Sequence, residues 1–274
     1  MTSVGPTPDE LLHLAVAAAR DAARLVQSGA ARGVTVAATK SSDVDVVTES
    51  DRSAERLIRR SLLGARPDDA ILGEEAEGDQ SDEPGSSGVR WIVDPIDGTV
   101  NFLYGIPQYA VSIAAELDGE VVAGVVLNVA TGQEYTATAD GPAQRDGVPL
   151  RVRPVVPLAE RLIGTGFSYE ARQREIQAAA LLRLLPRIRD IRRLGSCALD
   201  LCGVAQGSLD GYLEEGVNLW DHAAGGLVAQ RAGARVQSER GVGGRAIVLA
   251  APEGGFDEFR SAVAQAGYLA SSGS

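Results

Sequence analysis

The residues best suited to catalysis lie in the segment WIVDPIDGTVNF, which spans residues 91–102. An apolar run ends at Asp94, Pro95 keeps Asp94 extended and turns the chain, and Asp97 follows three residues after Asp94. Two carboxylates can therefore converge on one point at the end of a buried strand. Hard oxygen ligands of this kind suit Mg²⁺, which leaves its remaining positions to water and substrate phosphate.

Gly98 and Thr99 follow directly and favour phosphate binding. Glycine allows a phosphate to approach the backbone, and the free amides at the start of a helical turn point towards an anion. Carboxylates for a metal beside amides for a phosphate are typical of phosphoryl transfer. A simple helix cap and turn would use the same residues, so the motif alone leaves both interpretations open. A covalent mechanism of the haloacid dehalogenase type is disfavoured, because the residue two before Asp97 is Pro95 and not an aspartate.

The overall composition limits the partners and cofactors. The 274-residue chain is 45% hydrophobic, which predicts a folded core. Its net charge of −11 disfavours nucleic acid or an anionic membrane as a partner. Cys197 and Cys202 fit no zinc or redox spacing. The first residues lack a signal-peptide pattern and no apolar run is long enough to span a membrane, so we expect a cytoplasmic protein. Lys40 is the only lysine, which marks either a site that needs a compact ammonium or a chance survivor.

Hydrophobic periodicity predicts the elements that must position these residues. In the first part of the chain the spacing predicts helices at 8–28 and 48–63 and strands at 34–39, 70–72, 89–93, 110–116, 121–129 and 133–138. The last three strands are typical of an antiparallel meander. After the proline-marked stretch 151–157, strands at 161–165, 189–191, 210–214 and 246–250 alternate with helices at 170–185, 197–207, 221–233 and 255–267. This alternation indicates a second, α/β half. We therefore expect two halves, residues 1–152 and 153–274.

Two motifs resemble the signatures of the inositol monophosphatase family. WIVDPIDGTVNF is similar to the first signature, and LWDHAAGGLVAQRAGA at 219–234 is similar to the second. The resemblance covers nearly the whole chain, and the bacterial SuhB type is the most similar subgroup. It implies a mixed α/β fold, a layered αβαβα sandwich in which an N-terminal antiparallel sheet with helices joins a C-terminal α/β half. It also implies Mg²⁺-dependent hydrolysis of inositol 1-phosphate by a metal-activated water, without a phosphoenzyme.

The resemblance further implies roles for individual residues. The implied metal ligands, which would hold two or three Mg²⁺ ions, are Glu74, Asp94, the carbonyl of Ile96, Asp97 and Asp221. The implied catalytic residues are Glu74, Thr99, Asp51 and Lys40, of which Glu74 and Thr99 would orient the attacking water. The implied substrate contacts are Asp97, Gly98, Thr99, Ser196, Cys197, Glu214 and Asp221. Cys197 stands where the family usually has alanine, which leaves the shape of that wall open.

Two alternatives accompany this interpretation. Histidinol phosphate is the main rival substrate within the same fold, although residues 100–102 and Glu214 favour the inositol type. A regulatory binding protein of this family is the alternative from another functional class. The resemblance also implies inhibition by lithium and a homodimer, and the expected partner is a small phosphate monoester.

Overall fold

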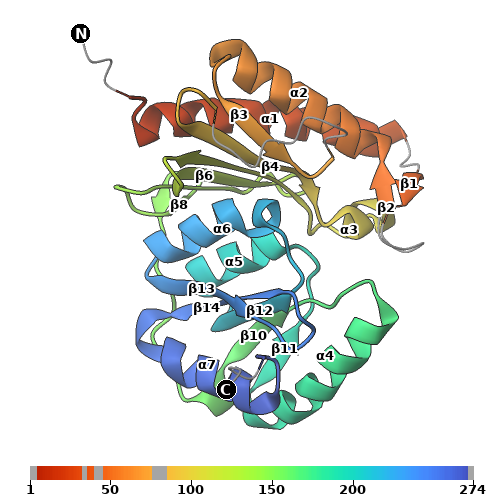
Figure 1. Cartoon of the computed structure of the whole chain (residues 1–274), viewed down its shortest axis with the longest axis vertical. Coiled ribbons are helices and arrows are strands. Elements are labelled where there is room, and N and C mark those ends of the chain that lie inside the picture. The colour runs from red at the N-terminus through yellow and green to blue at the C-terminus, as the bar shows by residue number, and fades with distance from the viewer. Residues whose placement is uncertain (1–4, 33–35, 40–45, 76–84, 271–274) are drawn as a thin grey trace.

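The computed structural model describes residues 5–32, 36–39, 46–75 and 85–270. Five layers follow one another along the long axis of the molecule: a pair of helices, a sheet, a second pair of helices, a second sheet and a third pair of helices (Figure 1). This arrangement confirms the predicted αβαβα sandwich of mixed α/β class.

Helices α1 (Pro8–Arg32) and α2 (Glu49–Ala65) form the outer layer over the first sheet (Figure 1). The apolar residues of α1 recur at helical spacing and are buried: Leu11, Ala15, Ala18, Ala19, Ala22 and Val26. A capping box formed by Thr48 and Asp51 begins α2. Both predicted helices are confirmed, and each extends a few residues past its predicted C-terminus.

The first sheet has seven strands in the order β3-β4-β5-β6-β7-β8-β9. Their bounds are β3 (Ala70–Gly73), β4 (Val89–Asp97), β5 (Ala110–Leu117), β6 (Glu120–Asn128), β7 (Glu134–Thr138), β8 (Gln144–Arg145) and β9 (Val148–Pro149). All neighbouring strands are antiparallel except β3 and β4, so the predicted meander is confirmed. A separate antiparallel pair joins β1 (Val36–Thr39) to β2 (Val46–Thr48). Strands β2, β8 and β9 were not predicted, because two or three residues are too few to form a periodic pattern.

Helices α5 (Cys197–Ala205) and α6 (Leu219–Arg231) lie between the two sheets (Figure 1). Every residue of α5 is buried, as expected for a helix that is covered on all sides. Small residues permit the close packing, since a Cβ on Gly124 of β6 would lie 3.1 Å from the Cα of Ala224 on α6. One apolar cluster joins side chains of β4 and β6 to side chains of α5 and α6, so the two predicted halves share a core. The boundary at residue 152 stays a prediction.

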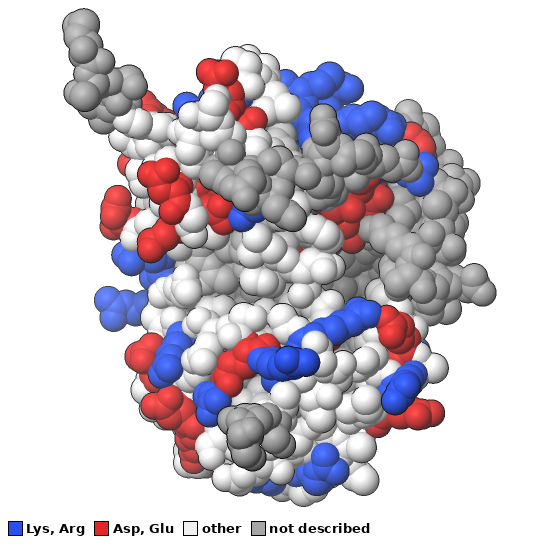
Figure 2. Space-filling model, viewed as in Figure 1, with Lys and Arg blue, Asp and Glu red and all other residues white. Residues whose placement is uncertain are grey.

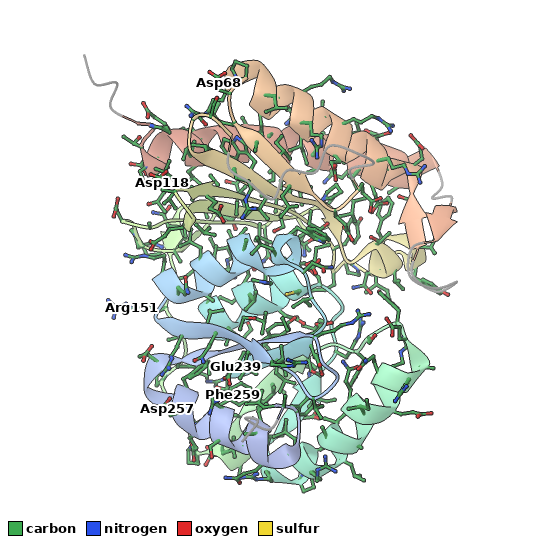
Figure 3. The ribbon with its side chains drawn as sticks, viewed as in Figure 1. Asp68, Asp118, Arg151, Glu239, Asp257 and Phe259 are labelled. Atoms are coloured by element: carbon green, nitrogen blue, oxygen red, sulfur yellow. The ribbon has the colours of Figure 1, made fainter. Side chains whose placement is uncertain are left out.

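The second sheet has five strands in the order β11-β10-β12-β14-β13. Their bounds are β10 (Leu162–Thr165), β11 (Asp190–Arg192), β12 (Gly211–Glu215), β13 (Ala234–Arg240) and β14 (Ala246–Pro252). Helices α4 (Ala171–Leu184) and α7 (Phe256–Ala266) form the last layer, and Phe259 of α7 is fully buried (Figures 1 and 3). Strand β13 was not predicted, because its sequence ARVQSER is mostly polar and lacks a clear alternation.

Several charged side chains lie at the periphery and not in the interior. Figure 3 places Asp68, Asp118, Arg151 and Asp257 at the edge of the molecule, and all four are exposed. Figure 2 shows acidic and basic side chains intermixed on the face that it presents. Such exposed groups are solvated, unlike the buried carboxylates of Asp94 and Asp97. No helix in the described ranges is long and apolar enough to cross a membrane.

Candidate active site

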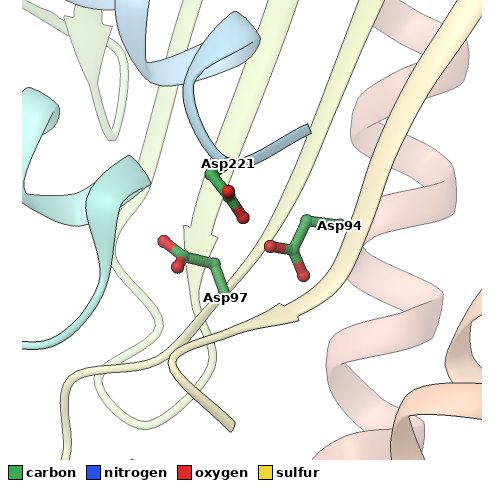
Figure 4. Close-up of side chains that lie close together, drawn as sticks. All are labelled: Asp94, Asp97 and Asp221. Atoms are coloured by element: carbon green, nitrogen blue, oxygen red, sulfur yellow. The ribbon is translucent and has the colours of Figure 1, made fainter. Parts of the chain in front are cut away.

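Three aspartates meet where the first sheet faces the middle helices. One carboxylate oxygen from each of Asp94, Asp97 and Asp221 lies within 4.8 Å of the other two. Asp94 and Asp97 come from β4 and Asp221 comes from the first turn of α6, and the three side chains point towards one another (Figure 4). The structure thus brings together three of the predicted metal ligands from distant parts of the sequence.

A β-bulge turns the two aspartates of β4 to the same side. The three steps from Asp94 to Asp97 on β4 match only two steps on β5. In a regular strand, residues three apart face opposite sides of the sheet, and the extra residue of a bulge cancels this difference. The strand continues through Pro95 to Asp97, so the prediction that it ends at Val93 is wrong. The carboxylates converge on a bulge within the strand and not on a turn after it.

Burial and mutual repulsion make it costly for these carboxylates to ionise together. Burial first, and then the nearby carboxylates, raise the pKa of Asp94 and the pKa of Asp221 well above the usual value. Burial also raises the pKa of Asp97 to about 7. Protons or a cation must offset this repulsion. Because several carboxylate oxygens converge in a buried position, the donor set fits a hard divalent cation such as Mg²⁺.

Glu74 lies beside this cluster. It follows β3 directly, and its backbone amide donates a 3.1 Å hydrogen bond to the carbonyl of Val93. Among the neighbouring charges that raise the pKa of Asp94, the carboxylate of Glu74 has the largest effect. The parallel pairing of β3 and β4 therefore places this predicted ligand next to Asp94.

The N-terminus of α5 holds the carboxylate of Asp97. The hydroxyl of Ser196 donates to Asp97 over 2.5 Å, and the amides of Ala198 and Cys197 donate over 2.7 Å and 3.3 Å. The hydrogen bonds from Ser196 and from the amide of Ala198 lower the pKa of Asp97 against the larger effect of burial. Ser196 also caps α5, because its Oγ accepts from the amide of Leu199. Ser196 and Cys197, which were predicted to contact substrate, thus contact a predicted metal ligand.

Thr99 and Asp51 form a hydrogen-bonded pair. The hydroxyl of Thr99 lies 3.1 Å from Oδ1 of Asp51 and 3.0 Å from the carbonyl oxygen of Ile96. The other oxygen of Asp51 accepts from the amide of Thr48 over 2.9 Å and from its hydroxyl, within the capping box of α2. Burial raises the pKa of Asp51 to about 6. The start of α2 therefore fixes a buried carboxylate against the hydroxyl of Thr99.

Gly98 separates β4 from the short helix α3 (Thr99–Tyr104) and has φ of +97°. Two features disfavour a side chain at this position. The positive φ is unfavourable for residues other than glycine, and a Cβ would lie 2.8 Å from the carbonyl oxygen of Gln108. The same Cβ would lie 3.1 Å from the carbonyl oxygen of Gly195. The predicted phosphate cradle is thus packed closely against the turn that leads into α5.

A cavity of about 240 Å³ connects these groups. The predicted site residues that line it are Glu74, Asp94, Ile96, Asp97, Gly98, Thr99, Cys197, Glu214 and Asp221. Asp51 and Ser196 are buried outside this lining, and Lys40 lies outside the described residues. Glu214, on β12, accepts a 2.8 Å hydrogen bond from the hydroxyl of Tyr212, and burial raises its pKa. The C-terminal half therefore contributes Glu214 and Asp221 to a cavity whose other wall is β4.

Several residues of the cavity were not assigned to the site from the sequence. Among them are Phe167, Ser168, Tyr169, Arg193, Val217, Asn218 and Arg245. They come from separate segments, and no motif connects them. Trp220 packs against the apolar cluster between the first sheet and the middle helices and also lines the cavity, and its ring nitrogen is buried without a hydrogen-bond partner among the described residues. Trp91 lies away from the cavity lining, is fully buried and donates to Asp69 over 2.8 Å.

Comparisons with known proteins agree with this architecture. The profile of the inositol monophosphatase family matches residues 7–266. The inositol-1-monophosphatase SuhB of Mycobacterium tuberculosis strain H37Rv is 49% identical over 232 residues, which cover 82% of this chain and 80% of that protein. The Nus factor SuhB of Pasteurella multocida is 37% identical over 230 residues, which cover 82% of this chain and 84% of that protein.

Solved structures give the same result. The structure of Mycobacterium tuberculosis SuhB matches with a TM-score of 0.81 at 42% identity, over 96% of this chain and 99% of that chain. The extragenic suppressor protein SuhB of Bartonella henselae matches with a TM-score of 0.82 at 32% identity, over 92% and 98%. Family profile, relatives and structures agree over most of the sequence, and the chain belongs to the inositol monophosphatase family.

Proposed function

We propose that the protein is a Mg²⁺-dependent phosphomonoesterase that hydrolyses inositol 1-phosphate to inositol and phosphate. Family membership supports phosphatase activity, and the substrate is the finer part of the proposal. The observation that carries it is the meeting of three carboxylates within 4.8 Å, beside the hydroxyl of Thr99, in one cavity. Carboxylates for a metal next to backbone amides for a phosphate suit phosphoryl transfer to water.

Asp94, Asp97, Asp221, Glu74 and the carbonyl of Ile96 would hold the metal ions. Bound Mg²⁺ would lower the pKa of a water molecule and neutralise charge on the phosphate and the leaving oxygen. The hydrogen bonds from Ser196 and from the α5 amides keep the Asp97 carboxylate in place for this role.

Thr99 and Glu74 would orient and deprotonate the attacking water. The hydroxyl of Thr99 donates to Asp51, so its lone pairs remain available to accept a hydrogen bond from water. Asp51 is ionised above its pKa of about 6 and can accept this bond at neutral pH. Glu74 would take the proton that the water loses. The amides of Gly98 and Thr99 would bind phosphate oxygens.

Glu214 would accept hydrogen bonds from substrate hydroxyls. Its Oε2 is held by the hydroxyl of Tyr212, which fixes the carboxylate at the cavity wall. Cys197 lines the same wall of the cavity. The size of its thiol therefore affects which leaving groups fit there. A polyol presents several hydroxyls to such a carboxylate, which favours inositol over a leaving group with fewer donors.

A substrate panel with and without Mg²⁺ tests the proposal. Phosphate release from inositol 1-phosphate should require Mg²⁺ and show a higher kcat/KM than release from histidinol phosphate. Asp94→Asn should abolish release, whereas the matched control Asp68→Asn, at an exposed position, should leave it unchanged. A clear preference for histidinol phosphate would overturn the substrate assignment, and release that is independent of Mg²⁺ would overturn the mechanism.

A regulatory role is the second candidate, because the relative from Pasteurella multocida is named a Nus factor. Asp94→Asn separates the two roles in cells that depend on this protein. If the variant lacks phosphatase activity but restores growth, regulation describes the protein better than catalysis.

We also propose a cytoplasmic homodimer that lithium inhibits. Light scattering would measure the oligomeric state, and a titration of phosphate release with LiCl at fixed Mg²⁺ would measure inhibition. A monomer, or activity that is insensitive to LiCl, would contradict the corresponding part.

A further inference from the structure

The charge of the cavity lining is uneven. Five carboxylates line the cavity: Glu74, Asp94, Asp97, Glu214 and Asp221. Within the described part of the chain, only Arg193 and Arg245 add positive charge to this lining. Neither arginine belongs to a metal-binding motif, so the proposed metal site does not explain why they line this cavity.

The two arginines differ in their partners. The guanidinium of Arg245 forms an ion pair with Glu170, and its backbone amide donates to Glu215 over 3.2 Å. Arg193 takes part in none of the ion pairs among the described residues. Its charge acts on Glu214: burial raises the pKa of this carboxyl, and the Tyr212 hydrogen bond and then the charge of Arg193 lower it. Of these two arginines in the described part of the chain, Arg193 is therefore the one that no ion pair holds away from a ligand, and its charge reaches the carboxylate that we assign to substrate hydroxyls.

The turn before α5 fixes where the guanidinium lies. Gly195 has φ of +93°, and a Cβ there would lie 2.5 Å from Nη1 of Arg193. The guanidinium thus occupies the space that the missing side chain leaves. Asn101 pins the same turn by donating to the carbonyls of Leu194 and Gln108 over 2.8 Å and 2.7 Å.

This turn also borders the proposed phosphate site. The carbonyl oxygen of Gly195 lies 3.1 Å from the position that a Cβ of Gly98 would take. Arg193 is therefore carried on a turn that adjoins the proposed phosphate cradle at Gly98, and its charge reaches the carboxylate of Glu214. A leaving group attached to a phosphate at the cradle would share one cavity with Arg193 and Glu214.

We propose that Arg193 is a specificity-determining residue that contacts the leaving group of the phosphate ester. Its guanidinium favours leaving groups with an anionic or acceptor substituent and disfavours leaving groups that carry an ammonium. This inference rests on the proposed phosphatase function and extends it to substrate choice. Arg193 and Glu214 together select an uncharged or acidic polyol, because one accepts hydroxyl protons and the other donates to oxygens.

The size of the effect follows from the exposure of Arg193. A pair of exposed charges typically contributes no more than about fivefold in an equilibrium constant, because water screens it. Exchanging an anionic for a cationic leaving group reverses the sign, so the two effects multiply to at most about 25-fold, and we expect the ratio between the two to depend on Arg193 by about tenfold, within that limit.

Three phosphate esters of three-carbon alcohols test the proposal: glycerol 1-phosphate, 3-phosphoglycerate and serinol phosphate. Their leaving groups are neutral, anionic and cationic. In Arg193→Gln, the ratio of kcat/KM for 3-phosphoglycerate to that for serinol phosphate should fall about tenfold, while Arg193→Lys should keep most of it. Raising the salt concentration should lower the ratio for the unaltered protein.

Arg192→Gln is the matched control. Arg192 is the neighbouring arginine, pairs with Asp190 over 2.8 Å and does not line this cavity, so its loss should leave the ratio unchanged. An active Arg193→Gln variant with an unchanged ratio, or an equal fall in the control, would overturn the assignment of Arg193. Failure of the unaltered protein to release phosphate from any ester with Mg²⁺ would instead overturn the proposed function.

Discussion

Replacing Ser196 with alanine should weaken metal binding through Asp97. Ser196 is 2% exposed, and its hydroxyl donates to Asp97 over 2.5 Å. A hydrogen bond to a charged group contributes about 1.5–3 kcal/mol, and contacts that orient metal ligands typically change metal affinity by about 10- to 100-fold. We therefore expect Ser196→Ala to raise the Mg²⁺ concentration that gives half-maximal phosphate release by about 10- to 100-fold.

The same substitution removes the cap of α5, and this second effect must be separated from the first. Loss of a helix cap costs about 1 kcal/mol. In a chain of this size that lowers the thermal midpoint by about 2–4 °C. Ser196→Thr retains a hydroxyl and should preserve both properties. Ser53→Ala, on α2, should change neither, because the Ser53 hydroxyl makes its hydrogen bonds within the described residues to the side chains of Glu49 and Arg56, away from the candidate site.

Two measurements decide between these roles. Phosphate release is followed against Mg²⁺ concentration, and unfolding is followed by circular dichroism with EDTA. If Ser196→Ala lowers the thermal midpoint but leaves the Mg²⁺ dependence unchanged, Ser196 is only a helix cap and the reasoning about Asp97 is wrong.

Three further predictions concern the same cluster. Because burial raises the folded pKa of Asp97 to about 7, above its unfolded value, the metal-free protein should lose stability as pH rises from about 4 to 7. Thermal midpoints in EDTA should therefore fall between pH 5 and pH 8, and Asp97→Asn should reduce that fall; an equal fall in the variant would contradict the assignment. Gly98→Ala should cost about 1–3 kcal/mol in a urea titration, since φ is +97° and a Cβ would meet the carbonyl of Gln108 at 2.8 Å; a stability change below about 0.5 kcal/mol would refute this. Thr99→Val should lower kcat at least about 100-fold, whereas Thr99→Ser should retain activity; similar kcat values for both would show that the hydroxyl is dispensable.

Local sequence patterns predicted most of the helices and strands because these elements require a regular apolar spacing, whereas their layered order was implied by the family resemblance. Helix α1 shows this clearly, with small and large apolar residues at every turn. Strand β4 shows the limit. Pro95 and the two aspartates are unfavourable in a strand, so the pattern predicted an end at Val93, and only pairing with β5 continues the strand to Asp97.

The residues of the site also differed in how well local sequence patterns predicted them. Asp94 and Asp97 form a local motif that could be interpreted from its own chemistry, whereas Glu74 and Asp221 were linked to it only through the family resemblance. Arg193 and Trp220 were missed as cavity residues, because a single arginine or tryptophan has no spacing signal and enters the cavity through the tertiary packing of distant segments. Ser196 was assigned to substrate, because its bond to Asp97 depends on how α5 approaches the bulge in β4.

The positions of the carboxylates explain why the site lies between layers. Asp94 and Asp97 are fixed by a sheet, while Asp221 is fixed by a helix that packs on that sheet. In the metal-free state their repulsion acts between these two elements, and it is opposed by the apolar contacts of the shared core and by the α5 amides that bind Asp97. A cation would reverse the sign of this interaction and join the sheet to the helix. Metal binding and the packing of α6 on the first sheet should therefore be coupled, so that the N-terminal turn of α6 opens most readily when the carboxylates are ionised and no metal is bound.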